Sequence, residues 1–262
     1  MNRIDAVFSE LKKAGQKALI TYVTAGDPDL EMTYWLVLEM EKAGADIVEL
    51  GIPYSDPLAD GPVIQRASAR ALKKGVKIPE IMKLVHSIRQ VSEIPLIYLV
   101  YYNSVFKYGI EKFVEESYEA GIDGLIIPDL PLEERGEVYD ILIRYNMHLI
   151  PLVAPTSHER IKKITENAGG FVYCVSITGV TGQREKIGTD IKSYMEEIAM
   201  YTDMPKAIGF GISGADMAAH LKNYCDGVIV GSAIVSEIEK ARDREEMVTK
   251  VSDFVKNVKS VL

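Results

Sequence analysis

Eight short runs of apolar residues recur along the chain, and longer amphipathic stretches separate them. The runs are nearly continuous in valine, isoleucine and leucine, a pattern typical of parallel strands that are covered on both faces. They span residues 18–24, 47–50, 96–101, 124–127, 148–153, 171–176, 206–210 and 227–230. Apolar residues at i, i+3, i+4 spacing predict helices between them, at residues 30–43, 63–74, 78–91, 110–120, 133–145, 158–167 and 191–201. The sequence therefore predicts an α/β protein in which strand and helix alternate.

The number of these strand–helix units decides between two α/β architectures. Eight units within 262 residues match a single (β/α)8 TIM barrel, whereas a doubly wound sheet more often stops at five or six strands. We expect the barrel, with residues 3–14 as an extra N-terminal helix that caps its bottom, room for an inserted helix in the second unit, and residues 242–261 as the closing helix. No linker rich in glycine, serine or proline divides the chain, so we expect residues 1–262 to form one catalytic domain.

Charge and cysteine content exclude several classes of protein. A formal net charge of -8 disfavours binding to nucleic acid or to an anionic membrane, because both are negatively charged. The two cysteines, Cys174 and Cys225, lie in or beside apolar runs and are predicted to be buried thiols in a reducing compartment. The longest apolar stretch, residues 94–102, is far shorter than a membrane span. We therefore expect a cytoplasmic protein that binds neither nucleic acid nor membrane.

The residues that follow the last three predicted strands are rich in glycine. In a (β/α)8 barrel, the loops after the strands carry the active site. Glycine lets backbone N–H groups approach a ligand closely, and a helix that begins just afterwards adds unpaired donors, which suits a phosphate group. The candidates are Gly211, Gly214, Gly231 and Ser232, with Gly182 reaching across from the sixth unit. The alternative is that these glycines serve only as turn residues and helix caps.

Glu49 is the most informative single residue, because it lies inside the apolar run of residues 47–50. Burial disfavours the charged form of a carboxyl group and raises its pKa toward neutral pH, as a proton shuttle requires. An ion pair with a lysine or arginine inside the barrel is the alternative. Asp60 follows eleven residues later, in a loop stiffened by three prolines. It could belong to the same site, or it could cap the helix that begins near Pro62.

The sequence also lacks the residues for other kinds of barrel chemistry. A Schiff-base aldolase needs a lysine at the carboxyl end of a strand, but Lys206 lies at the opposite end of its strand. The four histidines, at positions 86, 148, 158 and 220, are scattered along the chain, which favours structural roles over metal binding. No dinucleotide fingerprint follows the first strand. Acid–base chemistry by carboxyl groups, with no metal or cofactor in this chain, is the remaining expectation.

Five segments together indicate a family. They are residues 19–28 (LITYVTAGDP), 48–65 (VELGIPYSDPLADGPVIQ), 179–182 (GVTG), 209–213 (GFGIS) and 230–235 (VGSAIV). In order and spacing over the whole chain they closely resemble the tryptophan synthase alpha subunit family, and the second segment is highly specific. The resemblance implies a lyase of L-tryptophan biosynthesis, which cleaves indole-3-glycerol phosphate to indole and glyceraldehyde 3-phosphate in a retro-aldol step.

The resemblance also assigns roles to residues. Glu49 matches the catalytic proton shuttle, and Asp60 matches the catalytic aspartate that binds the indole N–H and favours a cationic ring. The residues expected at the indole slot are Tyr22, Val100, Tyr102, Ile126, Leu152, Tyr173, Thr181 and Phe210, and those expected at the phosphate are Gly182, Gly211, Gly231 and Ser232. Tyr22 departs from the phenylalanine common at its position, so its hydroxyl group needs a partner, and Val100 is smaller than the usual leucine.

A partner follows from the same resemblance. Members of the family work with a beta subunit, in an alpha–beta–beta–alpha heterotetramer, and the beta subunit carries pyridoxal phosphate, so that no cofactor is expected in this chain. Two alternatives remain at this point: a regulatory subunit that has lost its chemistry, and a free-standing lyase that releases indole. The presence of both Glu49 and Asp60 favours catalysis.

Overall fold

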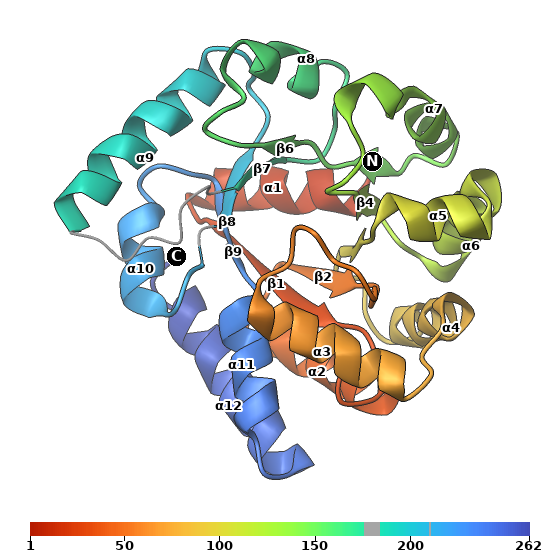
Figure 1. The fold of residues 1–262 in the computed structure, drawn as a ribbon. Helices are drawn as coiled ribbons and strands as arrows, with labels where there is room; N and C mark the ends of the chain where they lie inside the picture. Colours follow the sequence, from red (N-terminus) through yellow and green to blue (C-terminus); the bar gives the residue numbers. More distant parts are fainter. Residues whose placement is uncertain (176–183, 210) are drawn as a thin grey trace.

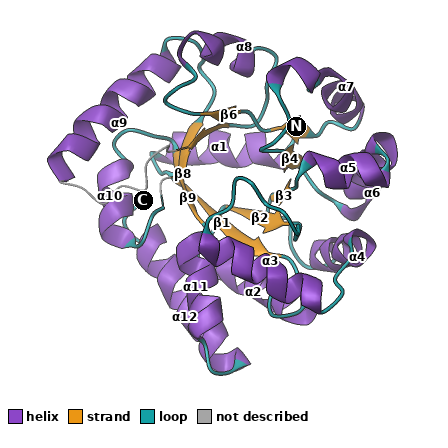
Figure 2. Cartoon of the chain, in the orientation of Figure 1, coloured by secondary structure: helices purple, strands orange, loops and turns teal. Residues whose placement is uncertain are grey.

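The computed structural model describes residues 1–175, 184–209 and 211–262, and within them it shows nine strands in one parallel sheet (Figures 1 and 2). The order across the sheet is β5-β4-β3-β2-β1-β9-β8-β7-β6. The strands are β1 Ala18–Thr24, β2 Ile47–Gly51, β3 Leu96–Leu99, β4 Gly124–Ile126, β5 His148–Leu149, β6 Leu152–Val153, β7 Val172–Val175, β8 Lys206–Gly209 and β9 Gly227–Val230. Each lies within or one residue beyond a predicted strand.

The sheet curls round so that its two outermost strands, β5 and β6, come from one segment of chain. That segment was expected to be a single strand, residues 148–153, but it pairs first with β4 and then with β7. Ile150 donates its backbone N–H to Leu125 on one side, and Pro151 accepts from Tyr173 on the other. Pro151 has no N–H to continue the ladder, which explains the interruption. The eight predicted strands thus form a (β/α)8 barrel, and the doubly wound alternative is wrong.

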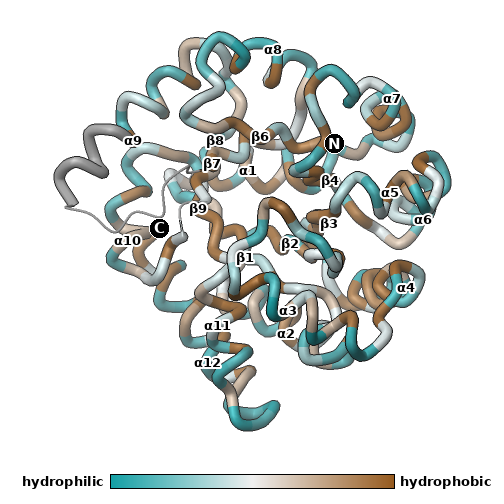
Figure 3. The backbone as a smooth tube through the Cα atoms, in the orientation of Figure 1, coloured by the Kyte–Doolittle hydropathy of each residue, from teal (hydrophilic) through white to brown (hydrophobic). Residues whose placement is uncertain are grey.

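Helices surround the sheet as a ring (Figure 1). The connecting helices are α2 Leu30–Lys42, α4 Ile78–Arg89, α6 Ile110–Ala120, α7 Gly136–Arg144, α8 Ile161–Thr165, α9 Arg184–Ala199, α10 Ala215–Leu221 and α12 Arg244–Lys259. Figure 3 shows the central strands mostly in hydrophobic colours and the surrounding helices in alternating hydrophobic and hydrophilic ones. Two predicted helices are shorter than expected, because 3-10 turns at Leu132–Glu134 and His158–Arg160 replace their first residues.

Among the described residues, three further helices lie in loops that follow strands: α3 Pro62–Lys73, α5 Tyr102–Tyr108 and α11 Ser232–Lys240. The inserted helix expected in the second unit is α3, so that prediction is confirmed. The short helix α5 was not predicted. Its seven residues carry the exposed ring of Phe106, so the segment lacks a regular apolar face. Helices α3 and α11 pack on each other and on β1, at the mouth of the barrel.

Helix α1, Arg3–Ala14, closes the opposite end, as expected. In Figure 1 it crosses the centre of the ring of helices. Its buried residues Ile4 and Phe8 belong to the cluster of side chains that fills the inside of the barrel. Ile4 lies beside Gly124 and Gly170, which stand at the beginning of β4 and just before β7. The helix therefore covers the amino ends of the strands.

No helix in the described part of the chain is both long and apolar enough to cross a membrane.

Alternation along each strand decides which side chains enter the barrel. On β3, Ile97 and Leu99 belong to the inner cluster, whereas Tyr98 and Val100 pack outward among the helices. Successive side chains of a strand point to opposite faces, so a shift of one residue moves a side chain from the inside to the outside. The composition of the site depends on this alternation.

Candidate active site

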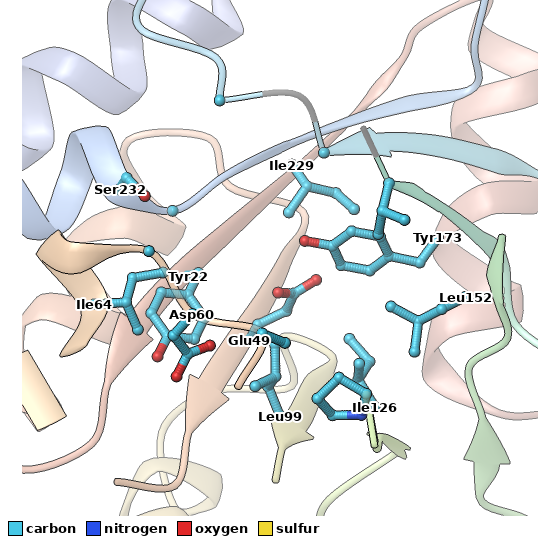
Figure 4. A pocket seen from close by; sticks show the side chains of 17 residues that line it. Tyr22, Glu49, Asp60, Ile64, Leu99, Ile126, Leu152, Tyr173, Ile229 and Ser232 are labelled. Carbon is cyan, nitrogen blue, oxygen red and sulfur yellow. The ribbon is translucent and has the colours of Figure 1, made fainter. Parts of the chain in front are cut away.

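A cavity of about 250 Å³ opens at the carboxyl ends of the strands (Figure 4). Most of its lining comes from inward-facing strand residues and from the loops before α3 and α11. The residues that line it are Tyr22, Glu49, Ala59, Asp60, Gly61, Ile64, Leu99, Ile126, Pro128, Leu152, Tyr173, Val175, Gly209, Gly211, Ile229, Gly231 and Ser232. Nine of these were predicted as site residues: Tyr22, Glu49, Asp60, Ile126, Leu152, Tyr173, Gly211, Gly231 and Ser232.

Glu49 projects into the cavity from β2 and is only 1% exposed (Figure 4). Neither of its carboxyl oxygens has a hydrogen-bond partner among the described residues. Burial raises the pKa of Glu49 to about 8. No lysine or arginine among the described residues forms an ion pair with Glu49, so the ion-pair alternative finds no support there. A carboxyl group that is protonated near neutral pH and faces a cavity is equipped to donate and accept a proton.

Asp60 lies at the end of the loop that joins β2 to α3, beside Tyr22 (Figure 4). Burial raises the pKa of Asp60, and a side-chain hydrogen bond from Tyr101 opposes this shift. The alternative role as helix cap is wrong, because the N-cap of α3 is Gly61 and no side chain caps this helix. The Asp60 carboxylate is therefore available to the cavity.

Tyr22 and Tyr173 form two walls of the cavity, and each ring lies against a glycine of the neighbouring strand. A Cβ atom on Gly51 would overlap the Tyr22 hydroxyl oxygen, and one on Gly209 would lie 2.7 Å from the Tyr173 ring. The Tyr22 hydroxyl group forms a 3.1 Å hydrogen bond with Thr24 Oγ1, which is the partner that the sequence left open. Burial raises the pKa of both tyrosines, and their electrostatic contacts with Glu49 and Asp60 raise it further.

The glycine-rich end of the cavity contains Gly211, Gly231 and Ser232. Gly231 is the N-cap of α11 and Ser232 is its first residue, so the unpaired N–H groups of that helix begin at the cavity. Gly211 has a φ of 58°, a conformation that favours glycine. Gly214, in contrast, is the N-cap of α10 and does not line the cavity. The turn-and-cap alternative is therefore right for Gly214.

Two predicted slot residues do not line the cavity. Val100 is fully buried in the outer cluster that packs against the helices. Tyr102 is the first residue of α5, and its ring contacts Phe106 at a centroid distance of 6.1 Å. The prediction was wrong because β3 ends at Leu99, which faces inward, and the next residue faces outward. Leu99 occupies the position on the wall that Val100 was expected to take.

Three predicted residues, Thr181, Gly182 and Phe210, lie outside the described residues. The prediction missed Leu99, Ile229, Ile64, Pro128 and Val175, which line the cavity. Strand alternation combined with the register between strands would have indicated Leu99, because Ile97 is the register partner of Glu49 on the inner face. No sequence signal distinguishes Ile64, since its place depends on how α3 folds over the mouth.

The fold and the cavity together define the class of the protein: a (β/α)8 barrel enzyme with acid–base groups at the carboxyl ends of its strands. The family model described as "Tryptophan synthase alpha chain" matches residues 8–262. The tryptophan synthase alpha chain of Caldanaerobacter subterraneus subsp. tengcongensis is 65% identical to this chain, and that of Clostridium kluyveri is 60% identical, each over 262 residues that cover 100% of both chains.

A crystal structure of the tryptophan synthase alpha chain from Legionella pneumophila gives a TM-score of 0.92 at 34% identity, covering 100% of this chain and 97% of that one. The chain therefore belongs to the tryptophan synthase alpha chain family. It is a lyase of tryptophan biosynthesis that cleaves indole-3-glycerol phosphate.

Proposed function

We propose that Glu49 is the proton-transfer group of this cleavage. The observation that carries the proposal is a carboxyl group buried in the cavity, without a hydrogen-bond partner among the described residues and with its pKa raised by burial to about 8. The protonated group would donate to the indole carbon that bears the side chain, so that the ring becomes an electron sink. The resulting carboxylate would accept the proton of the glycerol hydroxyl as the C–C bond breaks.

Asp60 is proposed to bind the indole N–H and to stabilise the positive charge that develops on the ring. Its carboxylate lines the same cavity as Glu49 and lies beside Tyr22 (Figure 4). A negative charge held in a partly buried site stabilises a nearby cation more strongly than it would in water. The apolar walls that would hold the ring are formed by Leu99, Ile126, Leu152 and Ile229, with the rings of Tyr22 and Tyr173.

The phosphate group of the substrate is proposed to bind at Gly211, Gly231 and Ser232. These residues line the end of the cavity where α11 begins. Glycine allows the backbone to approach the phosphate, and the helix N-terminus offers N–H groups and a partial positive charge. The substrate would then span the cavity, with its phosphate at α11 and its ring between the two carboxyl groups.

The chain is proposed to act as one catalytic domain in the cytoplasm, bound to a beta subunit in an alpha–beta–beta–alpha heterotetramer, with pyridoxal phosphate held by the beta subunit. A surface feature near the cavity supports a partner. Leu58 is 92% exposed in the loop between β2 and α3, next to a groove lined in part by Tyr54, Pro57 and Leu72. Exposed apolar side chains beside an apolar groove are typical of protein interfaces.

Condensation of indole with glyceraldehyde 3-phosphate, the reverse of the cleavage, tests the catalytic roles. The purified chain is expected to form indole-3-glycerol phosphate, whereas the Glu49→Gln variant is not. Product formation by the variant at the wild-type rate would refute the role of Glu49. Sedimentation of the chain with and without a beta subunit tests the partner, because a free-standing lyase would neither bind the beta subunit nor be accelerated by it.

A further inference from the structure

Helices α3 and α11 carry the two ends of the proposed substrate site, and they lie side by side at the mouth of the barrel (Figure 1). Asp60 stands two residues before Pro62, the first residue of α3, so the loop that holds this carboxylate leads directly into the helix. Ser232 lines the phosphate end of the cavity and is the first residue of α11. The distance between the two ends of the site therefore depends on how α3 and α11 are held against each other.

The apolar contact between these two helices is continuous with the wall of the cavity. Ala67 of α3 and Val235 of α11 are fully buried and form a small cluster with Tyr22. The backbone of Gly231 approaches the same residue, since a Cβ atom on this glycine would lie 3.4 Å from Tyr22 Cβ. A shift of α11 along α3 would therefore move the phosphate end of the cavity relative to the slot for the ring.

Charged side chains hold the outer side of the same contact. Glu239, near the end of α11, accepts hydrogen bonds of 2.8 and 2.7 Å from Arg66 and one of 2.7 Å from Arg70, both on α3. The Nε and Nη2 atoms of Arg70 donate to the buried carboxylate of Asp27, which belongs to the loop after β1. The planar guanidinium group fixes direction as well as distance. Arg70 therefore relates the position of α11 both to α3 and to the barrel.

We propose that Arg70 and Glu239 are positioning residues of the cleavage reaction, and that their ion pair sets the distance between the ring slot and the phosphate end, so that one substrate molecule reaches both. The inference rests on the substrate position proposed above. When two subsites match the length of a ligand, the second contact is intramolecular and has a high effective concentration. Separate fragments of the ligand need no such match. Loosening α11 should therefore weaken binding of the whole substrate more than binding of its halves.

The test compares Glu239→Gln with the wild type in the full chain. Glutamine keeps the size of the side chain and removes the charge, while Arg70 keeps its ion pair with Asp27, so the variant is expected to fold with a melting temperature near that of the wild type. Arg144→Gln is the matched control, because Arg144 also joins two helices, through a 2.9 Å ion pair with Glu111, and neither residue lines the cavity. The KM for indole-3-glycerol phosphate is expected to rise about fivefold in Glu239→Gln, with a smaller change in kcat. The control should match the wild type.

A second measurement does not depend on activity. The compound 3-(indol-3-yl)propyl phosphate lacks the hydroxyl groups that cleavage needs, and 3-methylindole and propyl phosphate represent its two halves. NMR titrations give a Kd for each compound. In Glu239→Gln the Kd of the whole compound is expected to rise about fivefold, while the Kd of each half stays within about twofold of the wild-type value.

Three results would overturn the proposal: an unchanged Kd for the whole compound, a weakening of one half that accounts for the whole effect, or an equal effect in the Arg144→Gln control. A different result marks a failure of the proposed function itself. If propyl phosphate does not compete with 3-(indol-3-yl)propyl phosphate on the wild-type chain, the phosphate does not bind where the cavity places it, whatever the variants do.

Discussion

At the scale of single residues, the burial of Glu49 serves catalysis but lowers the stability of the folded chain. Its buried carboxyl group has no hydrogen-bond partner among the described residues, and apolar neighbours such as Ile126 and Leu99 cannot solvate it, so its charged form is destabilising. The same neighbours raise its pKa to about 8, into the range where it can both donate and accept a proton at neutral pH. The burial of the Glu49 carboxyl group is therefore explained by its function and not by a contribution to folding.

We predict that Glu49→Gln retains the fold and lowers the rate of cleavage at least about a hundredfold, since glutamine cannot transfer the proton. The free energy of unfolding should also depend on pH differently in the variant and in the wild type. The pKa of Glu49 rises from 4.5 to about 8 on folding. Between these pH values the folded wild type keeps a proton that the unfolded chain releases, so its free energy of unfolding falls as pH rises.

The difference in unfolding free energy between variant and wild type, measured by urea denaturation from pH 5 to pH 8, isolates this effect. The variant should gain stability relative to the wild type across that range and reach a plateau above it. A difference that does not depend on pH would mean that the Glu49 carboxyl group is not protonated in the folded chain.

Asp60→Asn is predicted to weaken cleavage by about two orders of magnitude, because a neutral amide cannot stabilise the cationic ring. Stability should change little, since the Asp60 side chain caps no helix and no ion pair to it is found in the described part of the chain. Steady-state kinetics and a thermal melt check the two statements. Wild-type kcat in this variant would rule out the proposed charge stabilisation.

At the scale of elements, an ion-pair network joins the two helices that cover the mouth of the barrel. Arg70 on α3 donates two hydrogen bonds, of 2.8 and 2.7 Å, to the buried carboxylate of Asp27 in the loop after β1. It also binds Glu239 near the end of α11, and Arg66 binds the same glutamate with two further hydrogen bonds. The network fixes α3, which follows Asp60, against α11, which begins at the phosphate end of the cavity.

Arg70→Ala is predicted to lower the free energy of unfolding by about 2–3 kcal/mol, because it leaves the Asp27 carboxylate, only 2% exposed, without its partner. Arg66→Ala serves as the comparison. It removes only contacts with Glu239 on the surface, and we expect a loss of at most about 1 kcal/mol. Urea denaturation at neutral pH distinguishes them, and equal losses in the two variants would contradict the structural role of Asp27.

At the scale of the whole molecule, the two ends of the barrel have separate tasks. Helix α1 seals the amino ends with Ile4 and Phe8, and the Phe8 ring lies 5.5 Å from that of Phe171, centroid to centroid. The Asp5 carboxylate contacts His148 Nε2 at 2.9 Å and adds a polar attachment for the helix. The cavity opens at the carboxyl ends instead. In this fold the first end is expected to determine stability and the second to determine function.

Phe8→Ala is therefore predicted to lower the free energy of unfolding by about 3 kcal/mol, through the lost burial of the ring and the space it leaves. The KM for indole-3-glycerol phosphate should stay within about twofold of the wild-type value at a temperature where the variant is folded. Denaturation and steady-state kinetics provide the two measurements. A large change in KM would show that the two ends of the barrel are coupled.

Local pattern was sufficient to predict the eight strands, the barrel, the helix at its bottom and the buried carboxyl group of Glu49. These features depend on residue type and spacing along the chain, because continuous apolar runs mark covered parallel strands and apolar neighbours raise a carboxyl pKa. The sequence also predicted that Gly211, Gly231 and Ser232 lie at the cavity. A glycine just before a helix indicates a turn whose backbone N–H groups can bind an anion.

Tertiary structure decided which of two neighbouring side chains on and after β3 reaches the cavity. Val100 and Leu99 are neighbours in sequence and equally apolar, yet only Leu99 faces inward. The choice depends on where β3 ends and on its register with β2, and both are set by pairing between strands distant in sequence. The contact between Arg70 and Glu239 likewise depends on tertiary structure: it joins segments 169 residues apart that the barrel brings together, and no local pattern encodes it.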